Sequence, residues 1–243
     1  MTTLLFRDDA YLQSCDAIVT AINERSGIML DRTVFYATAG GQPGDKGHIS
    51  WDGGMAEIAT AVYDGAKDVV HVPVSTDTLP PIGATVTASL DWKNRYRTMR
   101  AHTLMHLLCA SVPFAVTGGA IGEDGGRIDF DIPEGRIPDK LELSVRINQL
   151  IAEDHAISFR WITDAEMADN QHLIRTMSVK PPMGTGRVRL VMIGEDGKID
   201  LQPCGGTHLK STAAIGPIVV AKIENKGKIN RRIRIAFARG PQQ

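Results

Sequence analysis

Cysteine is scarce in this sequence: Cys15, Cys109 and Cys204 are the only three among 243 residues. Three scattered thiols are too few for a disulfide framework, and their odd number is typical of a reducing compartment. Long apolar runs are also missing, so no membrane span is expected. The N-terminus carries Asp8 and Asp9 and lacks the basic and apolar stretches of a signal peptide. We therefore expect a cytoplasmic protein.

A large overall charge is absent too, since the formal net charge is −1. Its distribution is uneven: residues 1–92 hold 5 Lys/Arg against 12 Asp/Glu, whereas residues 93–243 hold 22 against 16. Eight cations after residue 204, here called the basic strip, are accompanied by Glu224 alone: Lys210, Lys222, Lys226, Lys228, Arg231, Arg232, Arg234 and Arg239. The basic strip favours a polyanionic partner, because Lys and Arg displace counterions from phosphates. A solvated strand face is the alternative.

Short apolar or alternating runs fill the first part of the chain. They lie at 16–22, 27–35, 47–51, 56–63, 69–74 and 84–90, with Gly and Pro between them. This spacing predicts a compact β-domain or barrel over residues 1–92.

The second part, residues 93–243, mixes two periodicities. Apolar residues recur at helical spacing from 92 to 112. A second helix is expected over 138–155, with Pro138 near its start and apolar positions at Leu141, Val145, Ile147, Leu150 and Ile151. Strands are expected within 157–162, 188–193, 198–203, 217–224 and 229–238. The sequence thus predicts an α+β fold with a largely antiparallel sheet in a second domain.

Two pairs of metal-type ligands are the most informative feature. His102 and His106 share one face of the predicted helix, and Cys204 and His208 repeat the spacing of four in PCGGTHL. Three imidazoles and a thiolate form a reasonable tetrahedral zinc set, with one ion per chain. The sequence is not that of an H-E-x-x-H protease, because Thr103 stands where the general base would be.

A Gly-Gly-Gln turn lies in the acidic half of the chain. Gly40 and Gly41 permit a positive φ or a close approach to a ligand, so they could hold Gln42 where a polar group is useful. The segment lacks the strand, the G-x-x-x-x-G-K-[ST] motif and the helix of a phosphate loop. Alone it is most often only a turn.

The four motifs, taken in order, resemble a known family. TVFYATAGGQPGDKG, RAHTLMHLL, PCGGTHL and KIENKGKINRRIRI are similar to the editing domain of alanyl-tRNA synthetase and to its free-standing relatives, the AlaX proteins. The resemblance covers nearly the whole chain and matches the medium-length AlaX type. It implies a translation-factor-like β-barrel followed by an α+β editing core that contains zinc.

The resemblance also implies roles for individual residues. His102, His106, Cys204 and His208 match the zinc motif, with His102 and Cys204 expected to take part in catalysis. Gln42 and Thr33 match polar residues near the aminoacyl group, and Gly40 and Gly41 would help to bind it. Arg231 and Arg232 of the basic strip are expected to bind the substrate's phosphates.

The activity that the resemblance implies is hydrolysis of mischarged tRNA(Ala). The seryl ester is the first expected substrate, and the glycyl ester is the second. The tRNA is the expected partner, without a membrane or an obligate protein partner. Two other classes stay open: a nucleic-acid-binding module with a structural zinc, and a zinc hydrolase of small esters or amides. A deacylase for a different mischarged tRNA is a further alternative.

Overall fold

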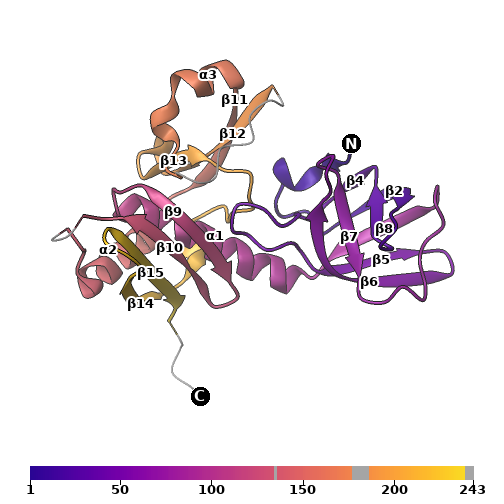
Figure 1. The fold of residues 1–243 in the computed structure, drawn as a ribbon, viewed down its shortest axis with the longest axis horizontal. Coiled ribbons are helices and arrows are strands. Elements are labelled where there is room, and N and C mark those ends of the chain that lie inside the picture. The colour runs from indigo at the N-terminus through magenta and orange to yellow at the C-terminus, as the bar shows by residue number, and fades with distance from the viewer. Residues whose placement is uncertain (134–135, 177–185, 239–243) are drawn as a thin grey trace. The chain divides into compact units, whose positions relative to one another are not determined.

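The computed structural model describes residues 1–133, 136–176 and 186–238. The chain divides into two compact units, Met1–Thr98 and Met99–Gln243. Helix α1 (Trp92–Ser111), labelled in Figure 1, begins in the first unit and ends in the second. Among the described residues, no helix combines the length and apolar character needed to cross a membrane.

The first unit is a closed antiparallel β-barrel, which confirms the expected N-terminal barrel. Its strands run in the order β2 (Ser14–Ile22), β3 (Ile28–Leu30), β7 (Val69–Pro73), β6 (Gly54–Tyr63), β5 (Gly47–Trp51) and β8 (Thr85–Leu90). Outside the six barrel strands, β1 (Thr3–Leu4) pairs in parallel with β4 (Arg32–Thr33). The 3-10 turn η1 (Leu5–Arg7) follows β1 and precedes β2.

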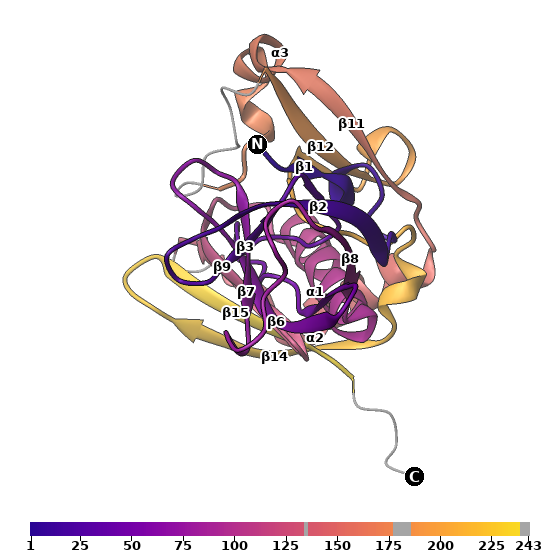
Figure 2. The ribbon, with the colours of Figure 1, turned by 90° about the vertical axis from the view of Figure 1, so that its right-hand side faces the viewer.

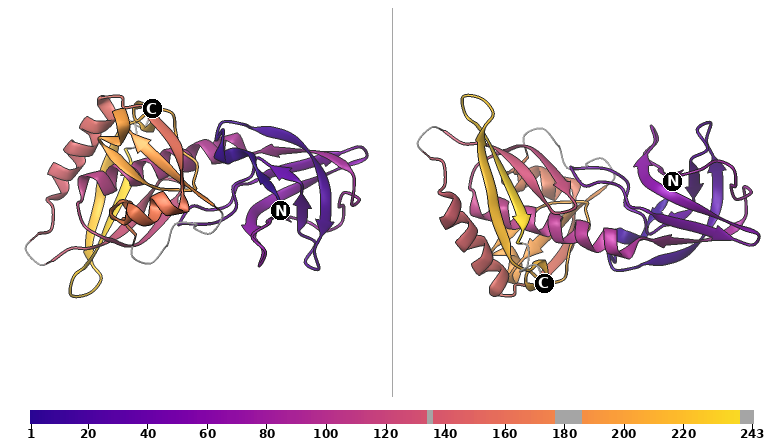
Figure 3. Two further views of the ribbon diagram at one scale, coloured as in Figure 1. Left: turned by 90° about the horizontal axis from the view of Figure 1, so that it is seen from above. Right: turned by 90° about the horizontal axis from the view of Figure 1, so that it is seen from below.

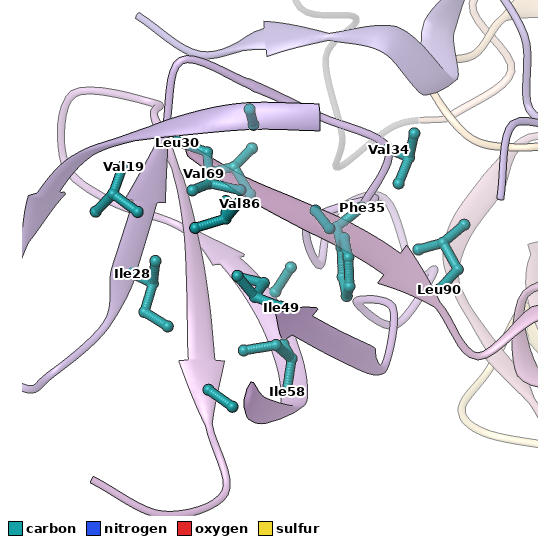
Figure 4. Packing of buried hydrophobic residues seen from close by; sticks show 14 of the residues in the cluster. Val19, Ile28, Leu30, Val34, Phe35, Ile49, Ile58, Val69, Val86 and Leu90 are labelled. Atoms are coloured by element: carbon teal, nitrogen blue, oxygen red, sulfur yellow. The ribbon is translucent and has the colours of Figure 1, made fainter. Parts of the chain in front are cut away.

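The barrel interior is filled with apolar side chains (Figure 4). Strand β8 shows how the sequence produces this, because Val86, Ala88 and Leu90 alternate with partly exposed Thr and Ser residues. Alternate residues of a strand point to opposite faces, so each strand contributes one apolar row. Phe35 and Ile49 close the interior and are 0% exposed.

A buried ion pair fixes the Gly-rich segment to the first turn of α1. The guanidinium of Arg95 donates hydrogen bonds to the carboxylate of Asp45, with Nε at 3.0 Å from Oδ1, and to the carbonyl of Val34 at 2.6 Å. The amide of Tyr36 also donates to Asp45 Oδ2, at 2.6 Å. Because Arg95 is 0% exposed, its charge is stable there only through these partners.

The second unit contains two antiparallel sheets. One has the order β14 (Ile218–Asn225), β15 (Asn230–Phe237), β10 (Gly125–Asp131) and β9 (Val116–Gly122). The other has the order β11 (Ile157–Thr163), β12 (Arg187–Ile193) and β13 (Asp200–Pro203). The α+β architecture with antiparallel pairing is as predicted, although the strands form two sheets instead of one.

Helices cover both sheets. Helix α2 (Lys140–Ala152) lies along β14 in Figure 3, and α3 (Asp164–Asp169) lies beside β11 and β12 in Figure 2. Short 3-10 turns occur at η2 (Gln171–Leu173), η3 (Glu195–Gly197) and η4 (Ala213–Ile215).

The second predicted helix is present, but its apolar face differs from the prediction. Asp139 caps α2 by accepting hydrogen bonds from the amides of Leu141 and Glu142. Leu141 and Val145 were expected to face the core, yet they are 71% and 60% exposed. The buried face consists of Leu143, Ile147, Leu150 and Ile151. Their spacings of four, three and one place them on one side of the helix.

Candidate metal centre

The two predicted ligand pairs come together in the second unit. His102 and His106 stand one turn apart on α1, while Cys204 and His208 lie in the loop that follows β13. One donor atom from each of these four side chains lies within 4.8 Å of the other three. The three histidines are buried and Cys204 is half-buried. The group could therefore hold a metal ion.

Two of the donor separations fit a tetrahedral ion. Sγ of Cys204 lies 3.5 Å from Nε2 of His102 and 3.3 Å from Nε2 of His208. A tetrahedral zinc, with Zn–S of about 2.3 Å and Zn–N of about 2.0–2.1 Å, would set its sulfur and nitrogen ligands about 3.5 Å apart. The chemistry of the set, three imidazoles and one thiolate, is that of zinc sites in proteins.

A buried carboxylate orients His106. Nδ1 of His106 donates a hydrogen bond to Oδ2 of Asp200 at 2.7 Å, which leaves Nε2 as the nitrogen available to a metal. The side-chain amide of Gln202 donates to the same carboxylate oxygen at 2.8 Å. Burial by itself lowers the pKa of His106, but the hydrogen bond to Asp200 and the contact with Cys204 raise it to about 10. Carboxylates in this position fix the tautomer and ring orientation of metal-ligating histidines.

Thr103 orients the last ligand. Its hydroxyl lies 3.3 Å from Nδ1 of His208 and accepts a hydrogen bond from the amide of Leu209 at 3.2 Å. With Nδ1 engaged by Thr103, Nε2 of His208 faces the sulfur of Cys204. The residue that excludes an H-E-x-x-H protease thus supports the ligand loop instead.

Arg189 anchors the loop that carries Cys204. Nη1 of Arg189, on β12, donates hydrogen bonds to the carbonyls of Cys204 at 3.2 Å and Gly206 at 3.0 Å. The amide of Cys204 in turn donates to the carbonyl of Arg189 at 3.0 Å. Arg189 is 7% exposed, so these bonds lie out of water and hold the loop firmly.

The two thiols of this unit differ in ionisation. Burial alone would raise the pKa of Cys204, but the neighbouring charges of His102 and His208 outweigh it and bring the pKa well below its ordinary range. Burial raises the pKa of Cys109 to about 12, and the charge of Asp200 adds to that effect. The lowered pKa of Cys204 favours the thiolate that a metal ligand must be, whereas the raised pKa of Cys109 favours its neutral thiol.

Comparisons with known proteins agree with this geometry. Residues 188–234 match the family model described as the threonyl and alanyl tRNA synthetase second additional domain. Residues 7–94 match the model described as tRNA synthetases class II (A). The first match contains Cys204 and His208, and the second contains the barrel.

Relatives of similar length decide the family. The chain is 34% identical to an alanyl-tRNA editing protein AlaX-M of Methanosarcina acetivorans, over 96% of this chain and 98% of the relative. It is 29% identical to the AlaX-M protein of Saccharolobus solfataricus over 96% and 98% of the two chains. The chain belongs to the AlaX-M alanyl-tRNA editing family.

A longer relative shows the link to the synthetases. An alanine–tRNA ligase of Pyrobaculum arsenaticum is 32% identical over 92% of this chain, but the match spans 25% of that enzyme. The resemblance stated from the four sequence motifs is thereby confirmed. AlaX editing proteins are aminoacyl-tRNA deacylases, so this family consists of hydrolases.

Thr33 is enclosed in the barrel. It is 0% exposed, its hydroxyl lies 2.8 Å from Nε2 of His71, and it accepts the amide of Phe35 at 3.0 Å. His71 Nδ1 donates to the carbonyl of Ile28 at 2.9 Å, so the hydroxyl of Thr33 donates to Nε2. Burial lowers the pKa of His71 to about 4, which keeps the ring neutral. These contacts are sufficient to explain a threonine at this position.

Gly40 and Gly41 form a tight turn closed by Gln42. Their φ angles are 56° and 84°, in the left-handed region that favours glycine. The amide of Gln42 donates to the carbonyl of Ala39 at 2.9 Å, and the amide of Ala39 donates back at 3.2 Å. Gln42 is 0% exposed. Its expected role at the aminoacyl group stays a prediction.

Arg231 and Arg232 have protein partners. Arg231 is 4% exposed and donates to the carbonyls of Gly227, Asn230 and Lys228, where it closes the β14–β15 turn. Arg232 forms a bidentate ion pair with Asp129, with Nε at 2.7 Å from Oδ1 and Nη2 at 2.8 Å from Oδ2. The hydrogen bond from Arg232 lowers the pKa of Asp129. Both arginines are built into the sheet, and their predicted contact with phosphates stays a prediction.

Three supporting residues of the centre were not predicted. Asp200 and Gln202 could have been found from the strand period, because both fall on one side of β13 and Cys204 follows at the same spacing of two. Arg189 had no comparable signal, since it is one of two alternating cations in RVRLVM.

Proposed function

We propose that this protein hydrolyses the ester of mischarged tRNA(Ala), with seryl-tRNA(Ala) as the first substrate and glycyl-tRNA(Ala) as the second, and that it holds one zinc ion. The observation that carries the proposal is the cluster of His102, His106, Cys204 and His208 in a chain of the AlaX-M family. AlaX-M relatives are alanyl-tRNA editing proteins by name, which supports the choice of tRNA.

A zinc ion held by these residues would supply a Lewis acid for the ester carbonyl when one of its four positions opens to the substrate. The protein's own groups prepare the site. Asp200 holds Nδ1–H of His106, and Thr103 engages Nδ1 of His208, so each ring presents Nε2 to the centre. Arg189 fixes the loop of Cys204 through two carbonyls. Such support keeps ligand geometry within the narrow limits that catalysis requires.

Selectivity must reject the correct alanyl ester. Serine differs from alanine by one hydroxyl, and a site that hydrogen-bonds this group discriminates strongly against the analogue without it. The resemblance nominates Thr33 for this contact and Gln42 for orienting water or the ester, with Gly40 and Gly41 close to the substrate. The enclosed position of Thr33 supports a structural role instead, so its variants are tested below.

The direct test is deacylation of tRNA(Ala) charged with serine, glycine or alanine by the purified protein. We expect rapid loss of the seryl ester, slower loss of the glycyl ester and at least tenfold slower loss of the alanyl ester. Metal analysis should find about one zinc per chain. His106→Ala and Cys204→Ala should lose zinc and activity together.

Other results would favour the alternatives. tRNA binding without turnover of any ester would indicate a nucleic-acid-binding module with a structural zinc. Hydrolysis of small esters at rates independent of tRNA would indicate a general zinc hydrolase. Normal deacylation by zinc-free Cys204→Ala protein would exclude a catalytic role for the cluster.

A further inference from the structure

One face of the β11–β13 sheet carries a ladder of alternating cations and aromatic rings. Trp161 on β11 pairs directly with Arg189 on β12, and Phe159 pairs with Val191 two residues along. The guanidinium of Arg187 lies 4.3 Å from the ring centre of Trp161, and that of Arg189 lies 4.4 Å from the ring centre of Phe159. We call Arg187, Trp161, Arg189 and Phe159 the stacking ladder.

The stacking ladder is separate from the apolar cluster of this sheet. The cluster contains Val188 and Leu190, with Met167 of α3 packed on them. These two β12 residues alternate with Arg187 and Arg189, and alternate residues point to opposite faces. Phe159 is 37% exposed, and Trp161 is half-buried. The two rings and Arg187 therefore form a partly exposed surface on the face opposite the Val188 and Leu190 cluster. Arg189 is buried beneath them, and the same face is packed further along, at Val191 and Ile193.

The same sheet face leads to the metal cluster. Arg189 is a member of the ladder, and it also contacts the loop of Cys204 by donating hydrogen bonds to the carbonyls of Cys204 and Gly206. Trp161 is the pairing partner of Arg189, whose carbonyl accepts the amide of Cys204. With neighbouring strands about 4.8 Å apart, the backbone of Trp161 lies about 10 Å from that of Cys204. One or two nucleotides span such a distance.

We propose that the stacking ladder receives the unpaired nucleobases at the 3′ end of the tRNA while the ester lies at the metal cluster. The inference rests on the proposed function, which places an acylated 3′ end at Cys204. Aromatic rings and guanidinium planes are the surfaces on which proteins stack single-stranded bases, and Arg also attracts the backbone. In the described parts of β11, β12 and β13, the sole carboxylate on this face is Asp200, which His106 engages.

The occupant follows from this chemistry. A peptide strand could pair with the edge of β11 without using the rings at all, whereas stacked bases require rings and planar cations. The position beside the metal cluster requires an occupant that is continuous with the ester substrate. A single-stranded RNA end meets both requirements.

A thermodynamic cycle tests the proposal without relying on catalysis. Binding of uncharged tRNA(Ala) is compared with binding of the same tRNA lacking its last three nucleotides, for wild type and for Trp161→Ala. We expect the truncation to weaken wild-type binding about tenfold or more, and to have little effect in Trp161→Ala. Trp161→Phe should restore the wild-type difference.

Phe237→Ala is the matched control. The guanidinium of Arg100 lies 4.1 Å from the ring centre of Phe237, as in the ladder, but Phe237 is on β15 in the other sheet. This variant should behave like wild type. Intact tRNA(Ala) should also quench tryptophan fluorescence, and Trp161→Phe should abolish that quenching although Trp51 and Trp92 remain.

The outcomes separate the two proposals. If wild type deacylates seryl-tRNA(Ala) but truncation weakens wild type and Trp161→Ala equally, the ladder does not contact the 3′ end and the inference is wrong. If no ester of tRNA(Ala) is hydrolysed, the proposed function fails instead. A tenfold effect of Phe237→Ala on the cycle would also overturn the assignment to the ladder.

Discussion

Asp200 and His106 form the innermost support of the metal centre, with Oδ2 accepting the Nδ1 proton at 2.7 Å and both side chains at least 94% buried. The carboxylate selects one tautomer of the imidazole and prevents rotation of the ring. It also increases the basicity of Nε2, the nitrogen that a metal would take. Strand β13, which was predicted without any role in the site, thus orients the ligand His106 on α1.

Removing that carboxylate charge should weaken metal binding. Asp200→Asn keeps the size of the side chain, and we expect zinc affinity to fall about 10- to 100-fold. Competition with a chromophoric chelator measures the affinity. Asp129→Asn is the control, because Asp129 pairs with Arg232 away from the cluster. Equal affinity for Asp200→Asn and wild type would mean that the hydrogen bond does not contribute to the site.

The metal centre shows which parts of a site can be predicted from sequence. His102 and His106 were found because a helix repeats its face every three to four residues, and Cys204 with His208 because ligand types recur at a fixed spacing. Arg189 was not found because its contribution is a contact with the backbone of the loop that follows the neighbouring strand. Such contacts depend on sheet register, and a single sequence does not specify register.

The Gly-rich hairpin of β9 and β10 was missed for a different reason. Residues 116–131 include five glycines, and glycine is depleted in strands. The structure explains one of them: a Cβ on Gly126 would lie 2.9 Å from Sδ of Met105 on α1. Close packing of β10 on the helix therefore requires glycine there. Local propensity does not favour a strand in this segment, and tertiary packing produces one.

Acid should weaken the barrel through His71. Its folded pKa of about 4 lies below the ordinary value of 6.5, because burial disfavours the charged ring. The neutral ring is thus the folded form, so its stabilisation is complete above pH 6.5 and is lost as the pH falls toward 4. Over that window the loss amounts to roughly 3 kcal/mol.

Urea unfolding at several pH values measures this dependence. His71→Gln should be less stable than wild type at pH 7 but should lose less stability between pH 6.5 and 4. His48→Gln is the control for removing a barrel histidine, since His48 lies half-buried on β5. An identical pH dependence for wild type and His71→Gln would show that another group governs acid sensitivity.

Thr33→Val distinguishes recognition from structure. The substitution keeps the shape of the side chain, but it leaves Nε2 of His71 and the amide of Phe35 without their buried partner. We expect unfolding free energy to fall by about 1–3 kcal/mol, with the ratio of seryl to alanyl ester hydrolysis unchanged. The opposite result, normal stability with a tenfold narrower ratio, would establish the recognition role that the family resemblance implies.

Gln42→Ala is the companion variant. If Gln42 orients water or the ester, its removal should slow deacylation of seryl-tRNA(Ala) while zinc content stays at one per chain. If the residue serves only its own turn, the variant should lose stability and keep its rate per folded molecule. Measuring melting temperature, zinc content and kcat on the same preparation separates the two roles.

The basic strip divides into cations with structural partners and cations that face solvent. Arg234, Lys222 and Lys226 contact Glu224 and, with the hydrogen bond from Arg234 as the largest effect, lower its pKa to about 2. Lys228 is exposed at the β14–β15 turn, which Arg231 closes from the inside. Arg239 lies outside the described residues. Charge reversal should therefore have different effects along the strip.

Lys228→Glu should weaken tRNA binding and reduce the slope of log affinity against log salt by about one unit, since an exposed lysine that contacts a phosphate releases about one counterion. Stability should not change. Arg231→Met should instead lower the unfolding free energy by about 1–3 kcal/mol, because three hydrogen bonds to backbone carbonyls are lost, and leave the salt slope of the folded protein intact. Titrations of uncharged tRNA(Ala) at several salt concentrations, beside urea unfolding, measure both effects. A reduced slope for Arg231→Met at unchanged stability would instead place Arg231 on the phosphate backbone, as the charge pattern alone predicts.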